Sequence, residues 1–583
     1  MHFVRSLFLG FICFCLMYSI SMAQIPGGYE KGLSTISKKE IYESISVLAA
    51  DSMKGRPAGS RENLTAARYI AERFRQYGLK PLFKSTRKNI NKNADNEDVS
   101  DLSASDDPSQ DDLYLQKFVI KKFKLSDNNS LSISSNFANG SSKLSYKYLT
   151  DFLVQFPVPE NLNTSAPIVF AGYGIDKGEK GYSDYLDKDG KSLDVRNKIV
   201  VVVDGFPQER DTLSLFSKSK NALYRNILRK ADLAQEKGAL AVIVIGSPFK
   251  NEPPMNIRCE KMLHNFQRET FCIPGLEKRE IPIIYVSQKI LNDLFEGSGK
   301  KAVEILENID KSLKPESFEI KDKTLSLEIG FDEDMLKTQN VIGVIEGTDP
   351  VLKNEFVVIG AHYDHIGLGY YGTSDKNSIG KIHNGADDNA SGVSGLLEIA
   401  EAFSKCPAKR SILFISFSGE ENGMLGSKYY VNSQPLKPLD KTVAMLNLDM
   451  IGRNERNELW LGGAFYSTDI IKVAERANKE VSMNLLYNTG LYTLGSDQAS
   501  FLRKGIPSLY FFSGIHEDYH MPTDDIEKID VQKVENVSKL AYLTAWISGN
   551  EAVKAAFREV SMKERAEIVR ESRIRQEKLK QNK

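Results

Sequence analysis

The stretch Gly385-Ala-Asp-Asp-Asn-Ala-Ser-Gly392 decides how we interpret this chain. Two adjacent carboxylates stand between glycines, directly before an apolar helical pattern made of Val393, Leu396, Leu397, Ile399, Ala400 and Phe403. Asp and Asn at a helix start accept hydrogen bonds from the first amide groups, so capping alone would explain an isolated acidic turn. This turn is not isolated, because further imidazoles and carboxylates lie upstream and downstream of it.

These other polar side chains follow short apolar runs that predict buried strands. His362 follows residues 356–361, Glu420 and Glu421 follow 412–417, Asp449 follows 444–448, and His520 comes one loop after 509–512. Continuous apolar runs separated by helices predict a largely parallel sheet covered on both faces. Ligands bind beyond the carboxyl ends of such strands, so we expect these side chains to meet at one edge.

The residue types favour a metal centre. Histidines with carboxylates and no thiolate suit zinc or a similar ion, and so many ligands predict two ions that share one carboxylate. Glu420 and Glu421 cannot easily bind the same ion from one turn, so one of them is free to act as general base beside a metal-bound water. Asp364, two residues after His362 on the same strand face, can accept the second imidazole proton.

Five motifs together resemble the di-zinc aminopeptidases, whose superfamily includes bacterial leucyl aminopeptidases and glutamate carboxypeptidase II. The motifs are His362-x-Asp364, Gly385–Gly392, Gly419-Glu-Glu-x-Gly-x-x-Gly-Ser427, Asn447-Leu-Asp-Met450 and Asp518-Tyr-His520. The resemblance implies an α/β fold with a mixed, largely parallel central sheet flanked by helices. It also implies an inserted, smaller, β-rich α/β domain of the protease-associated (PA) type, because residues 172–246 resemble that domain.

The resemblance also assigns roles to single residues. It makes Asp388 the bridging ligand of two zinc ions. His362 with Asp449 then completes one zinc site, and Glu421 with His520 completes the other. The family pattern further implies a cis peptide bond between Asp388 and Asn389.

Five more residues receive expected roles from the same likeness. Glu420 matches the general base, Asp364 the residue that orients the imidazole, and Tyr519 a tyrosine that steadies the oxyanion. Asp497 and Met450 are candidates for substrate binding. Gln498 departs from the Ser-Asp-His pattern of the family, which bears on substrate fit.

These expectations favour an exported di-zinc exopeptidase that acts on peptides, and an aminopeptidase in particular. A carboxypeptidase or dipeptidase is the alternative, with Arg453 near Asp449 as its only support. A glutaminyl cyclase is less favoured because those relatives work with one zinc. A receptor-like ectodomain of this superfamily would have lost metal ligands, and this chain keeps five of them and the base.

Length and charge predict several domains and exclude a general attraction to nucleic acid. The chain has 583 residues, with 77 Lys and Arg against 77 Asp and Glu. We expect a zinc peptidase domain in residues 36–145 and 317–549 and a PA domain in 146–316. Within the first, residues 88–112 form an acidic insertion without expected order. Residues 550–583, with ten basic and six acidic side chains, predict a charged helical tail.

Residues 1–23 have the pattern of a signal peptide that is cleaved before Gln24, which predicts a periplasmic or secreted protein. No later segment predicts a membrane span, and the sequence does not indicate an oligomeric state. Export permits disulfides, and Cys259 with Cys272 is the favoured pair because the two are close in sequence. Cys406 would then remain as a small apolar residue.

Overall fold

The computed structural model divides into two compact units. Unit 1 comprises residues up to Ile120 and from Met335 onward, and unit 2 comprises Lys121–Asp334. The structure describes residues 24–83, 113–137, 140–155, 161–218, 221–247, 249, 253–258, 260, 269–276, 281–433, 439–487, 493–561 and 564–571. The expected signal peptide, the acidic insertion and Cys259 lie outside these residues, so the pairing of Cys259 with Cys272 stays a prediction.

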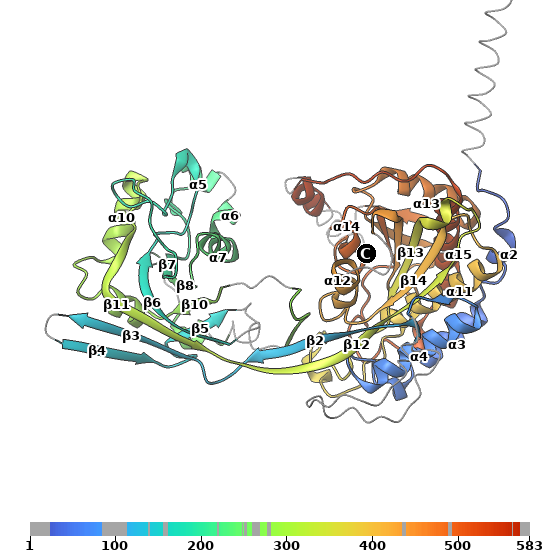
Figure 1. The fold of residues 1–583 in the computed structure, drawn as a ribbon, viewed down its shortest axis with the longest axis horizontal. Coiled ribbons are helices and arrows are strands. Elements are labelled where there is room, and N and C mark those ends of the chain that lie inside the picture. Colours follow the sequence, from blue (N-terminus) through green and yellow to red (C-terminus); the bar gives the residue numbers. More distant parts are fainter. Residues whose placement is uncertain are drawn as a thin grey trace, which may run out of the picture. The chain divides into compact units, whose positions relative to one another are not determined.

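A mixed sheet forms the centre of unit 1 (Figure 1). Its strands run in the order β17-β16-β18-β15-β13-β14-β12-β2, and β1 also pairs with β12. Strand β9, the next in the same order, lies within unit 2 and pairs with the part of β2 beyond residue 120. The inner strands β14, β13, β15 and β18 are parallel, whereas β12 and β16 pair antiparallel to their neighbours in that set. The bounds are β1 (Lys80–Pro81), β2 (Leu115–Leu125), β9 (Thr270–Cys272), β12 (Phe331–Ile345), β13 (Phe356–His362), β14 (Ser411–Phe417), β15 (Thr442–Leu448), β16 (Glu458–Gly462), β17 (Asn484–Leu486) and β18 (Ser508–Phe512).

Helices cover both faces of this sheet, which explains why its inner strands are largely apolar. Every residue of β13, β14 and β15 is buried. One face packs with α11 and α15, and the other with α12 and α14, as Figure 1 also shows. The helices of unit 1 are α2 (Glu30–Leu33), α3 (Lys38–Leu48), α4 (Arg61–Gln76), α11 (Gly392–Lys405), α12 (Leu425–Asn432), α13 (Thr468–Val481), α14 (Gln498–Leu502) and α15 (Val531–Asn550).

Unit 2 is a smaller unit around its own sheet, in the order β4-β3-β11-β6-β7-β8-β10-β5. Strands β6, β7, β8 and β10 are parallel to one another, and the outer pairs are antiparallel. The strands are β3 (Ser130–Phe137), β4 (Gly140–Tyr146), β5 (Phe152–Gln155), β6 (Leu162–Phe170), β7 (Ile199–Val203), β8 (Ala241–Ile245), β10 (Ile283–Val286) and β11 (Phe318–Ile329). The helices are α5 (Leu215–Lys218), α6 (Asn221–Arg225), α7 (Ile227–Glu236), α9 (Gln288–Phe295) and α10 (Ala302–Ser312).

The expected fold class is confirmed, but the boundaries between the two units differ from the expected ones. The sequence placed the change at residues 145/146 and 316/317, whereas the units meet at 120/121 and 334/335. The reason is strand pairing. Strand β3 pairs with β4 and β11, and β11 pairs with β6, so these outer strands belong to the second sheet. Nothing in the residue pattern of these strands assigns them to one sheet or the other.

The expected helical tail is wrong for its first part. Residues 551–561 form no helix, and helix is present only at 564–571 among the described residues of the tail. The non-helical part binds to the body of unit 1 instead. The backbone N–H of Arg558 donates to the carbonyl of Tyr466 at 2.7 Å, and the ring of Phe557 stacks on that of Tyr466. These contacts replace hydrogen bonds within a helix.

Two smaller expectations are also answered by the structure. The peptide bond between Asp388 and Asn389 is cis, as the family likeness implies. Within the described part of the chain, no helix combines the length and the apolar character that a membrane span requires.

Glu398 is an acidic side chain in the core of unit 1. It lies on α11 with 1% of its surface exposed, and one carboxylate oxygen accepts a hydrogen bond of 2.6 Å from the backbone N–H of Ser37, before α3. Burial, together with the negative charges of Glu40 and Glu401, raises the pKa of Glu398 to about 8. The folded protein therefore keeps a proton that the unfolded chain releases above about pH 4.3.

We predict that this proton makes stability fall as pH rises. A group whose pKa is raised by folding stabilises the fold below its unfolded pKa, and that contribution is lost as pH rises through about 8. Glu398→Gln keeps an oxygen for Ser37 but removes the titration. Between pH 5 and 8.5, the Tm of the variant relative to that of the wild type should rise by roughly 2 °C or more. Glu43→Gln on the exposed face of α3 is the control, and parallel curves for Glu398→Gln and wild type would contradict the interpretation.

Candidate metal centre

The predicted site residues lie at the carboxyl ends of the parallel strands. His362 is the last residue of β13, and Asp449 directly follows β15. Glu420 and Glu421 follow β14 after a two-residue turn, and His520 lies in the loop after β18. These are the ends that the sequence pattern predicted, and they share one edge of the sheet.

Asp388 reaches the same edge from a tight turn before α11. Gly385 opens the turn with a φ of 59°, and a Cβ atom there would lie 2.1 Å from the carbonyl oxygen of Asp388 and 2.6 Å from the His365 ring. The backbone N–H groups of Asp387 and Asp388 donate to the carboxylate of Asp524 at 3.1 Å. The turn is therefore fixed from both sides, and the carboxylate of Asp388 points to histidines rather than capping α11.

The first candidate group of ligands consists of His362, Asp388 and Asp449. The Nε2 atom of His362 lies 3.2 Å from Oδ1 of Asp449 and 3.3 Å from Oδ1 of Asp388. The hydroxyl of Tyr510 donates to the other carboxylate oxygen of Asp449 at 3.2 Å, which fixes the orientation of that carboxylate. All three group members are buried.

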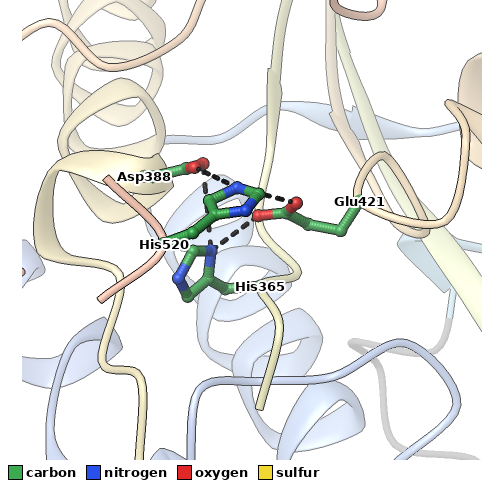
Figure 2. A group of neighbouring side chains, drawn as sticks. All are labelled: His365, Asp388, Glu421 and His520. Carbon is green, nitrogen blue, oxygen red and sulfur yellow. Dashed lines mark hydrogen bonds and ion pairs between the residues drawn. The ribbon is translucent and has the colours of Figure 1, made fainter. Parts of the chain in front are cut away.

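The second candidate group consists of His365, Asp388, Glu421 and His520, whose polar atoms point toward one another in Figure 2. The Nε2 atom of His520 lies 3.2 Å from both Oδ2 of Asp388 and Oε2 of Glu421. Its Nδ1 donates to the carbonyl of Gly372 at 2.7 Å, which leaves Nε2 to face the carboxylates. This is the usual arrangement for a metal-binding histidine.

Asp388 belongs to both groups and faces each with a different oxygen. Its Oδ1 is directed to His362 and its Oδ2 to His520, so one carboxylate spans the two groups. The structure thus brings together all five predicted ligands. Imidazole and carboxylate donors without thiolates fit zinc, and the groups therefore form a candidate metal centre.

Asp364 is close to His362, but by a different contact from the expected one. The Nδ1 of His362 donates to the backbone carbonyl of Asp364 at 3.1 Å, while the carboxylate lies 3.8 Å away. That carboxylate accepts the backbone N–H groups of Glu420 at 3.1 Å and Glu421 at 3.4 Å. Asp364 therefore orients the imidazole through its main chain and the glutamate turn through its side chain.

His365 is the residue of the centre that sequence reasoning missed. The family likeness gave it no role, but its Nδ1 lies 2.6 Å from Oε1 of Glu421 and 3.9 Å from Oδ1 of Asp388. The only signal was its place in His362-Tyr-Asp-His365, which did not separate a ligand from a neighbour. By contrast Asp387, which belongs to neither ligand group, accepts the N–H of Gly452 at 2.6 Å and lies 3.3 Å from His516.

The electrostatics of the centre favour a bound cation. Burial opposes charge on His520, yet Glu421 and Asp388 raise the pKa of His520 to about 11. Burial also opposes charge on Glu421, yet the imidazoles of His520 and His365 lower the pKa of Glu421 to about 2. The carboxylates thus keep a proton on the imidazole of His520. A divalent cation supplies the same positive charge and displaces that proton, so metal affinity should fall as pH falls.

Glu420 and Asp497 differ from the ligand carboxylates in their environment. Burial and the charges of Asp449 and Glu421 raise the pKa of Glu420 well above its ordinary value, although His362 opposes this. Asp497, just before α14, is fully buried, and burial raises the pKa of Asp497 to about 7. A carboxyl group with a raised pKa can take up and release a proton near neutral pH.

Tyr519 and Met450 lie beside the ligand groups. The Tyr519 ring stacks on the His520 ring with 3.9 Å between centroids. Met450 is buried in a cluster with Tyr510 and Phe512, against which Tyr519 also packs. Both candidates therefore lie beside the ligand groups, on an apolar wall.

Arg453, the support for a carboxypeptidase, is engaged elsewhere. Its Nη2 lies 2.7 Å from a carboxylate oxygen of Asp518, which is itself buried. The pKa of Asp518 lies well below its usual value because Lys528, Thr523 and Arg453 together outweigh its burial. This ion pair engages the Nη2 atom of Arg453 with Asp518.

Comparison with known proteins supports the same interpretation of the site. Residues 340–545 match peptidase family M28, and this stretch contains every ligand of both groups. The expected likeness to the zinc aminopeptidases is confirmed for residues 340–545, which are similar to peptidase family M28.

Proteins of similar sequence include aminopeptidases from bacteria and fungi. Aminopeptidase YwaD of Bacillus subtilis is 29% identical over 227 residues, which is 37% of this chain and 45% of that protein. The probable leucine aminopeptidase 2 of Arthroderma benhamiae is 30% identical over 186 residues, 30% of this chain and 34% of that protein. The chain thus spans less than half the length of these curated relatives.

Among solved structures, the aminopeptidase of Aneurinibacillus sp. strain AM-1 aligns with 92% of this chain and 99% of its own. Its TM-score is 0.47 and its identity 20%.

We predict that replacing Asp388 impairs metal binding more than replacing any other single ligand, because only Asp388 belongs to both groups. Asp388→Asn should lower total bound zinc to near zero, while Asp449→Asn should retain the zinc of the other group. Elemental analysis of dialysed protein measures both. The control is Asp387→Asn, whose amide oxygen can still accept the N–H of Gly452. Equal zinc contents in Asp388→Asn and Asp387→Asn would contradict the shared-ligand geometry.

Proposed function

We propose that this protein is an exported zinc aminopeptidase with two zinc ions in the centre described above. The observation that carries the proposal is the position of Asp388 between two ligand groups, with Glu420 next to a member of the second. His362, Asp388 and Asp449 would hold one ion, and Asp388, Glu421 and His520 the other. Zinc bound there would polarise a peptide carbonyl and lower the pKa of water.

The side chains around the centre then have separate tasks. Glu420 would accept the proton of the attacking water and deliver it to the nitrogen of the leaving amine. Its raised pKa in the absence of metal suits a group that must both take and give a proton. The Tyr519 hydroxyl would donate to the oxyanion that develops on the carbonyl oxygen. Asp364 would keep the turn with Glu420 and Glu421 in place through its two amide contacts.

The charged groups in the site indicate which end of the peptide substrate is bound. An aminopeptidase must bind a substrate ammonium group, and the carboxyl groups of Glu420, Asp449 and the buried Asp497 would accept hydrogen bonds from it. Met450 would contact the substrate side chain. A carboxypeptidase or dipeptidase needs a free cation for the substrate carboxylate, whereas Arg453 is paired with Asp518. We therefore favour the aminopeptidase.

Two further assignments belong to the same proposal. Residues 1–23, outside the described part of the chain, support export by their composition. Unit 2, inserted between the two segments of unit 1 and built on a mixed sheet of its own, would be the PA domain.

Blocking the substrate amine tests whether the protein acts at the amino end of a peptide. If the acidic side chains bind an ammonium group, acetylating the amine of a dipeptide or an aminoacyl anilide should lower kcat/KM by at least about 100-fold. The unblocked substrates with and without chelator are the control for metal dependence. Efficient cleavage of N-acetylated dipeptides would instead favour the carboxypeptidase or dipeptidase.

Glutamine substitutions of Glu420 and Glu421 should have different effects on zinc binding and on kcat. Glu420→Gln keeps the shape of the side chain but cannot accept a proton, so kcat should fall by at least about 10²–10⁴-fold while bound zinc is unchanged. Glu421→Gln should lose zinc and lower activity for that reason. Zinc content and kcat measured on both variants decide the matter. A Glu420→Gln protein that loses zinc while Glu421→Gln keeps it would reverse the two assignments.

A further inference from the structure

Residues 49–60, between α3 and α4, form a corner that packs tightly against the loops of the metal centre. Gly55 has a φ of 66°, and a Cβ atom there would lie 2.3 Å from the carbonyl oxygen of His383. A Cβ atom on Gly367 would lie 2.9 Å from the Pro57 ring. The corner thus touches the backbone of the loops that follow His362 and precede Asp388.

Arg56 extends from this corner and is 1% exposed. Its Nε donates to the carbonyl of Tyr363 at 2.7 Å, and its Nη2 donates to the carbonyl of Gly385 at 3.1 Å. Its Nη1 donates to the carbonyls of Asn384, at 2.8 Å, and Leu48. One guanidinium therefore joins the residue after His362 to the residue that opens the turn of Asp388.

Asn63, on the first turn of α4, holds the same loops from a second side. Its amide nitrogen donates to the carbonyl of Arg56 at 3.2 Å. Its carbonyl oxygen accepts the hydroxyl of Tyr363 at 3.2 Å and that of Ser418, two residues before Glu420, at 3.3 Å. Tyr363 is thereby fixed at its main chain by Arg56 and at its side chain by Asn63.

The charge of Arg56 also bears on the centre. Burial lowers the pKa of Arg56 to about 10, while the negative charges of Asp364, Asp388, Asp524 and Glu421 oppose that change. The guanidinium is therefore cationic at neutral pH and offsets repulsion among carboxylates brought close together. Lysine cannot replace it fully, because only arginine presents several donors in one planar fork.

We propose that Arg56 is a positioning residue that holds the His362–His365 segment and the Asp388 turn in register, and thereby sets the zinc affinity of the centre. The inference rests on the proposed metal centre and adds a determinant from the amino-terminal part of unit 1. Residues that orient metal ligands typically contribute about 10–100-fold to metal affinity or activity.

Arg410 provides a matched control for a role in stability alone. It is likewise 1% exposed, and it donates to the carbonyls of Ser548 at 3.0 Å, Glu551, and Ala552 at 3.3 Å, as well as to Glu355. None of these partners belongs to the metal centre. Loss of either arginine removes a buried guanidinium and its carbonyl contacts, but only Arg56 contacts the ligand loops.

The experiment measures zinc dissociation constants of folded, full-length protein by competition with a chromophoric chelator, together with thermal unfolding. Arg56→Gln should weaken zinc binding by about 10-fold or more. Arg56→Lys should weaken it by more than threefold, and Arg410→Gln should lower Tm while leaving zinc affinity within threefold of wild type.

A change of threefold or less in Arg56→Gln would overturn the inference, as would an equal loss of zinc affinity in Arg410→Gln. If Arg56→Gln does not fold, Arg56→Lys decides at the same threefold limit. A wild-type protein that binds no zinc would contradict the proposed metal centre itself, so the two failures are distinguishable.

Discussion

The structure of unit 1 depends on one buried arrangement, the carboxylate of Asp388 between the imidazoles of His362 and His520. Its two oxygens lie 3.3 and 3.2 Å from the two Nε2 atoms, and three further carboxylates stand around them on Asp449, Glu420 and Glu421. Carboxylates this close repel one another in a buried site unless positive charge is added. The need for positive charge explains both the histidines at the strand ends and the choice of metal as the natural occupant.

The surrounding fold supplies the rigidity that this arrangement requires. The parallel strands β13, β14, β15 and β18 bring four of the ligand loops to one edge, because their register aligns their carboxyl ends. Asp388 comes from a different direction and is held by the amide contacts of its turn with Asp524. The corner before α4 adds Arg56 and Asn63. The centre is therefore built from strand ends, one tight turn and one helical corner.

The sequence allowed prediction of the residues that meet, but less of what holds them. His362, Asp388, Glu421, Asp449 and His520 were accessible because ligand chemistry restricts residue type and apolar runs reveal strand ends. Hydrogen bonds to backbone groups impose no such restriction on sequence. For that reason the contacts of Asp524, Arg56 and the Asp364 carbonyl were not foreseen, and His365 received no role. The unit boundaries were misplaced for a related reason, since a strand such as β3 has the same pattern in either sheet.

Anomalous diffraction from crystals of the zinc-loaded protein, collected on both sides of the zinc absorption edge, tests the central claim most directly. The account predicts two peaks about 3.5–4 Å apart, one within bonding distance of each carboxylate oxygen of Asp388. One peak should adjoin His362 and Asp449, and the other Glu421 and His520. A single fully occupied peak in active crystals, or two peaks that do not share Asp388, would contradict it.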